Sequence, residues 1–207
     1  MVEPPADRFK ANYTEILTVT VQAYPEPAKT YFLHTSQATK TSKFFRDKAG
    51  GDVPIYLSLD IPNMFDTYVE WAYYGKLVIH EDFEQQHDSY DDLVRLYNLG
   101  IDLKDKAFCN AIMDATIERG SSHGWVTAYD PDRYLREDLI GCMIQLFVRV
   151  YAVLAKPGDR PSFEEGFAGY LLHEYQLMVH DMTRFRLPTM ADRCDYHDHD
   201  EGEPRCN

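Results

Sequence analysis

The sequence has no apolar leader at its start and no apolar run long enough to cross a bilayer. Its first residues, MVEPPAD, are polar and acidic, unlike a secretion signal. The longest apolar stretch, residues 139–154, is interrupted by Gln145 and Arg149. It is also shorter than the roughly 20 residues that a membrane-spanning helix needs. These features predict a cytoplasmic or nuclear protein that does not contact membranes.

Basic residues and cysteines are both scarce. The chain of 207 residues has 21 Lys and Arg against 34 Asp and Glu, a net charge of −13. This excess of acid repels phosphate backbones, so nucleic-acid binding through a basic surface is not expected. Without a secretion signal, disulfides are not the default for its four cysteines. Cys109 and Cys142 lie in apolar helical patterns and are predicted to be buried, whereas Cys194 and Cys206 lie in a polar tail.

The sequence also lacks the motifs of common enzyme classes. Gly50-Gly51 does not have the spacing of a phosphate-binding loop, and no G-x-S-x-G nucleophile motif occurs. His173 and His180 share a predicted helix face but lie two turns apart, too far to bind one metal ion without other ligands between them. We therefore predict a protein that is not an enzyme, and no residue is assigned a catalytic role.

What is present indicates a folded α+β protein with a small sheet flanked by helices and a helical extension after it. The 44% of hydrophobic residues is enough for a core. Alternating β-branched and aromatic residues predict strands at 18–21, 31–33, 54–59 and 77–79. Periodic apolar residues predict short helices within 35–48 and longer ones at 62–75, 93–101, 108–120, 132–156 and 163–186, the last with a Ser162–Glu165 capping box.

Three segments carry motifs that occur in a fixed order. They are His34-x7-Ser42-x-Phe44-Phe45, Phe65-x5-Trp71-x-Tyr73-x-Gly75, and Leu93-x2-Leu96-Tyr97-x-Leu99-Gly100-x-Asp102 followed by Asn110-Ala111-Ile112-Met113-Asp114. Together they resemble the BTB (POZ) domain, especially its divergent fungal group. The resemblance covers residues 14–120. It divides the chain into a flexible lead (1–13), a BTB-like domain (14–120), a helical extension packed on it (121–190) and an acidic Cys/His tail (191–207).

The resemblance implies a protein–protein interaction module that forms a homodimer or recruits other proteins. Some BTB relatives are substrate adaptors for cullin-type ubiquitin ligases, so a cullin-type scaffold is one implied partner. The positions that it marks as fold-defining or protein-binding are His34, Ser42, Phe44, Phe45, Trp71, Tyr73, Gly75 and Tyr97.

The chemistry of these residues favours structural roles. We expect His34 to hydrogen-bond a buried backbone or carboxylate group, and at least one of Phe44 and Phe45 to lie in the core. Trp71 and Tyr73 are two residues apart on a helix, so one is expected in the core while the other is a candidate anchor for a partner. Gly75 is expected to end that helix in a left-handed turn.

The tail contains the donors that zinc prefers, in the pattern Cys194-x2-His197-x-His199-x6-Cys206. In an extended segment the two histidines lie on the same side of the chain. A structural or catalytic zinc site at these four residues is the alternative function, and no other cofactor is predicted. Three further possibilities stay open: a Cys194–Cys206 disulfide, an acidic tail in solvent, or metal binding by the cysteines with a residue elsewhere, such as His123.

Overall fold

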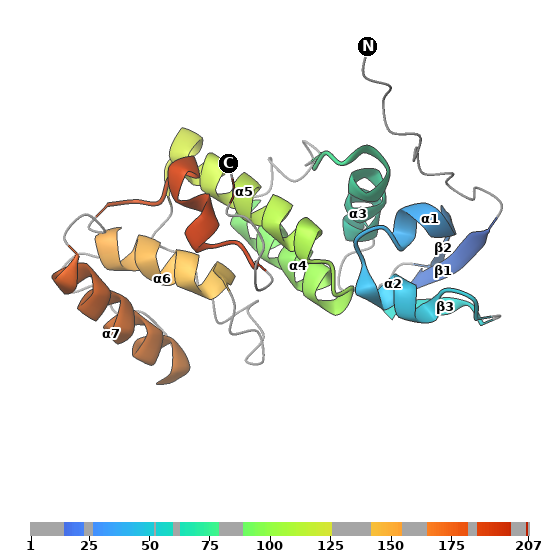
Figure 1. Ribbon diagram of the computed structural model, residues 1–207, viewed down its shortest axis with the longest axis horizontal. Helices are drawn as coiled ribbons and strands as arrows, with labels where there is room; N and C mark the ends of the chain where they lie inside the picture. Colours follow the sequence, from blue (N-terminus) through green and yellow to red (C-terminus); the bar gives the residue numbers. More distant parts are fainter. Residues whose placement is uncertain are drawn as a thin grey trace, which may run out of the picture. The chain divides into compact units, whose positions relative to one another are not determined.

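The computed structural model describes residues 15–22, 27–51, 53–59, 63–78, 89–125, 142–154, 165–181, 186–199 and 206. The fold is α+β, as predicted from the sequence (Figure 1). Its elements are β1 (Ile16–Gln22), β2 (Lys29–His34), α1 (Thr35–Ala38), α2 (Lys43–Lys48), β3 (Ile55–Ser58), α3 (Asn63–Tyr74), α4 (Ser89–Asp102), α5 (Lys106–His123), α6 (Cys142–Leu154), α7 (Glu165–His180) and the 3-10 helix η4 (Met190–Asp195).

The chain divides into two units, described separately below. The first unit is Met1–Val78 with Leu103–Asp105, and the second is Ile79–Asp102 with Lys106–Asn207. The α4–α5 pair therefore groups with the later helices, whereas the sequence-based boundary was drawn at residue 120. The expected flexible lead, residues 1–13, lies outside the described residues.

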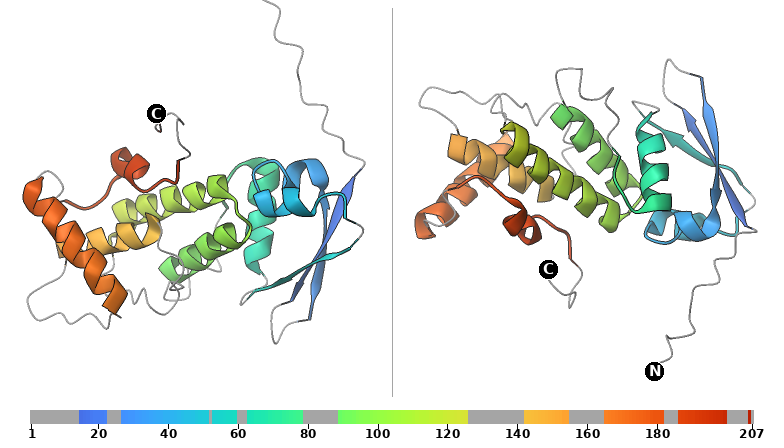
Figure 2. Two further views of the ribbon diagram at one scale, coloured as in Figure 1. Left: turned by 60° about the horizontal axis from the view of Figure 1, so that its bottom comes forward. Right: turned by 90° about the horizontal axis from the view of Figure 1, so that it is seen from above.

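The first unit contains a mixed three-stranded sheet with the order β2-β1-β3. Strand β1 is antiparallel to β2, with Leu17 opposite Leu33, and parallel to β3, with Val19 opposite Ile55. Successive side chains of a strand point to opposite faces, so Leu17, Val19 and Val21 share one face, and all three are buried. Helix α3 lies along this face, where the Tyr31 and Phe65 rings meet edge to face at 4.8 Å (Figure 2).

Two sequence predictions on either side of Gly75 have different outcomes. Gly75 does end α3: its φ is 65°, which favours glycine, and its N–H donates to the Trp71 carbonyl at 2.7 Å. The strand predicted at 77–79 is wrong for Leu77 and Val78, which are not extended into the sheet, and Ile79 lies outside the described residues. A short apolar run forms a strand only where a neighbouring strand can pair with its backbone. In the described sheet β2 and β3 are the edge strands, and Leu77-Val78 pairs with neither.

In the second unit, helix α5 is longer than predicted. It runs to His123 instead of ending at Gly120, and Gly124, with a φ of 90°, follows its last turn. Gly120 lies inside the helix against the Trp125 ring, where a Cβ atom would clash. The glycine was therefore misread as a stop signal because close packing, rather than a turn, requires it there.

Helix α6 is buried on several sides, as predicted, with seven buried residues that include Arg149. The Tyr175 hydroxyl of α7 donates to the Ala152 carbonyl of α6 at 3.3 Å. Helix α7 ends at His180, so the predicted end at residue 186 is wrong, and Arg186 is not helical. Pro188 disfavours helical conformation only at the residue before it, Leu187, so it sets an outer limit for the helix and does not explain the end at His180. The expected starts at 132 and 163, with Ser162, lie outside the described residues.

Among the described helices, none combines the length and the apolar content that crossing a bilayer would require.

Gly100 permits the close packing of α4 on α5, which yields a testable prediction. A Cβ atom at Gly100 would lie 2.6 Å from Cys109 Sγ and 3.0 Å from Phe108 Cδ1. We expect Gly100→Ala to lower the free energy of unfolding by about 1–3 kcal/mol, because overpacking forces neighbouring atoms to move. Thermal unfolding followed by circular dichroism measures this. Gly169→Ala in α7 is the control, since nothing lies within 4 Å of its Cβ position. A control shift as unfavourable as that of Gly100→Ala would contradict the packing argument.

Candidate metal centre

The tail begins with a tightly hydrogen-bonded turn at η4. The Thr189 backbone N–H and hydroxyl both donate to Asp192 Oδ2, each at 2.9 Å. Arg186 forms a bidentate ion pair with the same carboxylate: Nη1 donates to Oδ2 at 2.7 Å and Nη2 to Oδ1 at 2.5 Å. Burial pushes the pKa of Asp192 upward, but the bonds from Arg186 and Thr189 hold it below its usual value. A deprotonated Asp192 thus holds the start of η4 in a single turn.

The tail then contacts one face of α5 within the second unit. Lys106, Asn110 and Asp114 are spaced four residues apart, so they line one side of that helix. Asn110 bonds the backbone of Asp198 in both directions: its Oδ1 accepts from the N–H at 3.0 Å and its Nδ2 donates to the carbonyl at 3.3 Å. Lys106 lies 3.4 Å from the Asp198 carboxylate. These contacts fix the backbone between the two tail histidines.

Tyr196 anchors the same segment through its aromatic ring. Its side chain is 3% exposed, although the residues around it are mostly polar. Burying a tyrosine ring removes a large apolar area from water. Residues 190–199 therefore lie against other parts of the second unit, to which they belong. This does not fit a tail held in solvent by its acidic residues.

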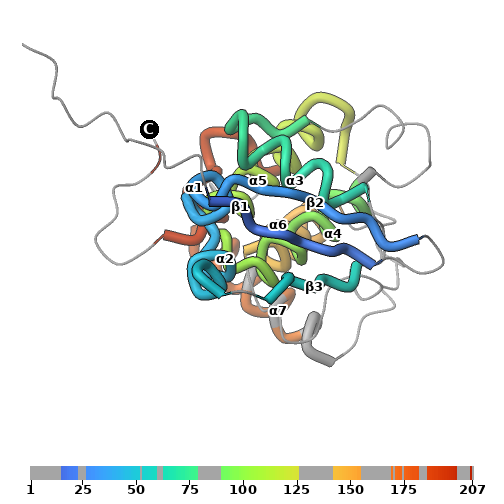
Figure 3. The backbone as a smooth tube through the Cα atoms, turned by 90° about the vertical axis from the view of Figure 1, so that its right-hand side faces the viewer, coloured from blue at the N-terminus to red at the C-terminus, as the bar shows by residue number. Residues whose placement is uncertain are grey.

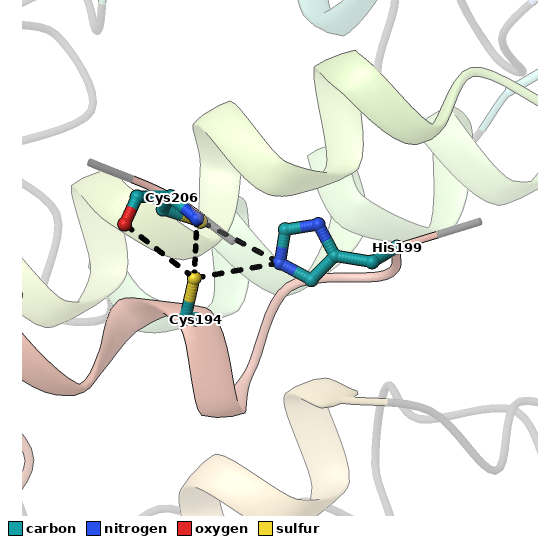
Figure 4. A group of neighbouring side chains, drawn as sticks. All are labelled: Cys194, His199 and Cys206. Carbon is teal, nitrogen blue, oxygen red and sulfur yellow. Dashed lines mark hydrogen bonds between the residues drawn. The ribbon is translucent and has the colours of Figure 1, made fainter. Parts of the chain in front are cut away.

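Three metal-binding side chains converge at the end of this segment. The donor atoms of Cys194, His199 and Cys206 all lie within 4.8 Å of one another. Figure 4 shows His199 directing a ring nitrogen toward the two cysteines, with Nε2 at 3.6 Å from Cys194 Sγ and 3.5 Å from Cys206 Sγ. Both cysteines are free thiols, so no disulfide joins them. The described donor group does not include His123.

The two cysteine sulfurs lie close to one another and are partly buried. The backbone N–H of Cys206 donates to Cys194 Sγ at 2.6 Å. Burial, followed by the adjacent Cys194, raises the pKa of the Cys206 thiol. Two neighbouring thiolates repel each other unless a cation lies between them, so this pair is suited to a divalent metal ion.

His197 lies beside this group and connects it to α5. Its Nδ1 is 3.0 Å from Cys206 Sγ, and its Nε2 is 2.8 Å from Asp114 Oδ1. The His197 side chain is 8% exposed and that of Asp114 is 33% exposed, so their contact is partly shielded from water. The structure thus brings together the four residues expected from the sequence and adds Asp114, which was not assigned a role. Asp114 follows Asn110 by four residues in a predicted helix, so the sequence indicated only that the two side chains share a helix face.

The other residues singled out in the sequence form structural contacts in the first unit. The Tyr73 hydroxyl accepts from the His34 backbone N–H at 2.9 Å and bonds His34 Nδ1 at the same distance. A tyrosine hydroxyl is therefore one partner of His34, and the expected bond to a buried backbone or carboxylate group stays a prediction. The His34–Tyr73 bond joins the end of β2 to α3 and engages Tyr73, the candidate partner anchor.

Ser42 and the phenylalanine pair organise helix α2. Ser42 is fully buried; its hydroxyl donates to the Leu103 carbonyl at 2.7 Å and accepts from the Phe45 N–H at 3.2 Å, which caps the helix. Phe45 is fully buried, and Phe44 is half-buried against it with ring centroids 5.4 Å apart. One of the two phenylalanines therefore belongs to the core, as predicted.

Trp71 and Tyr97 are both core residues. Trp71 is 9% exposed and lies beside Tyr68 in the first unit. Tyr97 is 4% exposed and belongs to the second unit, where burial raises the pKa of its hydroxyl. With Gly75 ending α3, the residues that carry the BTB resemblance contribute mainly to the fold.

Comparison of the chain with models of known protein families, and separately with curated proteins, gives no match.

Proposed function

We propose that this chain is a non-enzymatic protein–protein interaction module of the BTB type that associates with a second copy of itself. The order of the elements between residues 16 and 123 supports this proposal. A hairpin, two short helices, a strand, a helix and a helix pair occur in the order that the sequence predicts for the BTB-like segment. The single observation that carries the proposal is the exposed face of the sheet.

We define the outer sheet face by the strand residues that alternate with the buried ones. Phe32 and Tyr56 are the large aromatic residues on it, and they are 68% and 71% exposed. Figure 3 shows the strands β2, β1 and β3 side by side in this sheet. Large exposed aromatic side chains are enriched at protein interfaces and contribute much of their binding energy. The outer sheet face consists of Ile16, Thr18, Thr20, Gln22, Thr30, Phe32, Tyr56 and Ser58. His34, opposite Ile16 at the end of β2, is not counted because its ring bonds the Tyr73 hydroxyl of α3.

The charge of this face indicates the kind of partner. None of its eight residues carries a charge, whereas the chain as a whole has a net charge of −13. Two copies of so acidic a chain repel each other over most surfaces, and the repulsion is smallest where both present uncharged side chains. A face that meets its own copy about a twofold axis must be self-complementary, which uncharged threonine and aromatic residues allow. A second copy is therefore the partner that the outer sheet face fits.

The test is the oligomeric state of the purified chain. Sedimentation velocity over a concentration series is expected to show a reversible dimer, and Phe32→Ala with Tyr56→Ala is expected to weaken it at least tenfold. Truncating an aromatic hot-spot residue typically costs about 2 kcal/mol or more of binding free energy, so a tenfold loss of dimer affinity is the smallest effect expected. A second double variant, Thr18→Glu with Thr20→Glu, is expected to abolish the dimer by placing like charges opposite each other.

Tyr74 provides the matched control, because it is an aromatic residue of the same unit, 75% exposed at the end of α3 and outside the sheet. Tyr74→Ala should leave the dimer unchanged. A chain that stays monomeric at every concentration, or a double aromatic variant that dimerises like the parent, would contradict self-association through this face. Recruitment of a different protein, such as a cullin-type scaffold, would then be the competing proposal.

A further inference from the structure

We propose that the tail binds one zinc ion through Cys194, His197, His199 and Cys206, and that Asp114 on α5 orients His197 toward the metal. The site lies wholly within the second unit. This inference does not depend on self-association, since the outer sheet face belongs to the first unit.

The distances between donor atoms fit the edges of a zinc tetrahedron. With Zn–S near 2.3 Å and Zn–N near 2.0–2.1 Å, sulfur and nitrogen ligands lie about 3.5 Å apart. The distances from His199 Nε2 to Cys194 Sγ and to Cys206 Sγ are 3.6 and 3.5 Å. Both sulfur–nitrogen edges of this group are therefore close to those that bound zinc would require, and the two sulfurs lie within 4.8 Å of each other.

His197 supplies the fourth ligand. Its Nδ1 lies 3.0 Å from Cys206 Sγ, so the ring and the sulfur must separate by about 0.5 Å to reach the tetrahedral edge. His197 is not among the three residues whose donors lie mutually within 4.8 Å, so zinc binding also requires its ring to move closer to the other donors. The single residue between it and His199 places both rings on one side, with centroids 5.9 Å apart.

Asp114 determines which nitrogen of His197 faces the metal. Its carboxylate accepts the Nε2–H of His197 at 2.8 Å, which leaves the Nδ1 lone pair directed toward Cys206. Histidines that bind zinc commonly donate their other N–H to a carboxylate, which fixes the tautomer and makes the ligand more basic. This contact ties the metal site to α5 as well as to the tail.

Two thiolates and two imidazoles select zinc over harder cations, because magnesium and calcium prefer oxygen ligands. Four protein ligands also close the coordination sphere and leave no position for a substrate or a reactive water molecule. The proposed zinc ion therefore has a structural role: it holds the last residue of the set, Cys206, against η4 and α5.

The first test is zinc content measured by native mass spectrometry on the full chain before and after chelation. The parent chain is expected to carry one zinc ion, and the His197→Ala variant to bind it at least tenfold more weakly. His180→Ala is the matched control, because His180 is an exposed histidine at the end of α7 and outside the site. It should bind zinc like the parent.

The second test isolates Asp114. Asp114→Asn keeps the size of the side chain but removes the charged acceptor, and it is expected to lower zinc affinity by about tenfold to a hundredfold. Glu118→Gln removes an exposed acid one turn further along α5 and serves as the control. Competition with a coloured chelator measures all of these affinities.

Cobalt substitution gives a readout that a general loss of folding would not mimic. The cobalt-loaded parent should show the visible bands of a tetrahedral site with thiolate charge transfer, and cobalt-loaded His197→Ala should show an altered spectrum because water replaces a nitrogen. Circular dichroism confirms that each variant is folded. A parent chain that binds no zinc, or that oxidises to a Cys194–Cys206 disulfide under the same conditions, would overturn the proposal. Unchanged affinity and spectrum in His197→Ala would overturn the role of His197.

Discussion

Replacing Asp105 with alanine is expected to lower the free energy of unfolding of the first unit by about 3 kcal/mol. Asp105 is 1% exposed and lies in the Leu103–Asp105 loop. Its Oδ2 accepts from the Thr41 hydroxyl at 2.7 Å and from the Tyr68 hydroxyl at 3.0 Å. Alanine leaves both hydroxyls without this acceptor and opens a cavity, and both effects destabilise the folded unit.

Backbone hydrogen bonds also hold the Leu103–Asp105 loop in place. The Lys43 and Phe44 backbone N–H groups donate to the carbonyls of Lys104 and Leu103, at 3.1 and 3.2 Å. Lys104 adopts a φ of 49°, which is uncommon for a residue other than glycine and must be stabilised by its surroundings. Burial, with a further contribution from Asp105, raises the pKa of Tyr68, so its hydroxyl stays protonated and able to donate.

The two tryptophans of the chain make this measurement specific, because Trp71 belongs to the first unit and Trp125 to the second. In a Trp125→Phe background, urea unfolding followed by fluorescence reports on the first unit alone. Asp105→Asn keeps one carbonyl acceptor, so it should lower the free energy of unfolding by about half as much. This variant can be measured even if Asp105→Ala does not fold. Asp47→Ala on the exposed side of α2 is the control and should change stability by less than about 0.5 kcal/mol. Equal effects for Asp105→Ala and Asp47→Ala would contradict the role of the Asp105 network.

The second large effect is expected at Tyr196, the buried ring of the tail. Truncating a buried aromatic side chain to alanine typically costs about 3–5 kcal/mol. Because η4 is a turn held by its own local hydrogen bonds, the second unit can release it instead of unfolding completely, and the loss is expected as undocking of η4. The contacts of Asn110 and Asp114 with the tail should be lost at the same time.

Hydrogen exchange measures this undocking directly. The amides of Asp192 and Tyr196 donate to Thr189 and Arg193 carbonyls at 2.8 and 3.0 Å, so both are protected while the turn persists. In Tyr196→Ala, these amides should exchange at least a hundredfold faster while amides in the middle of α5 stay protected. Tyr196→Phe keeps the ring and should stay close to the parent. Unchanged protection in Tyr196→Ala would show that the ring does not anchor the tail.

Periodicity in the sequence was sufficient for most of the first unit. Alternating residues located β1, β2 and β3, because one face of each strand must be apolar to form the core. The helical spacing of Met64, Phe65, Tyr68, Val69 and Ala72 located α3, and Gly75 marked its end. The prediction failed at Leu77-Val78 and at Gly120. A strand needs a pairing partner, and the role of Gly120 depends on the packing of the Trp125 ring, and neither follows from the local pattern.

The identity of the candidate metal ligands also came from the sequence alone, because cysteine and histidine are recognisable as zinc donors without any structure. Their proximity could not be predicted this way. Cys206 is separated from His199 by six residues, and Asp114 precedes His197 by 83 positions, so the chain path between them sets no distance. The bonds of Asn110 and Asp114 on α5 with the tail, together with the burial of Tyr196, bring these groups together. Residue types thus determined which atoms could bind a metal, and tertiary contacts decided that they meet, because only a folded core fixes distances between remote parts of a chain.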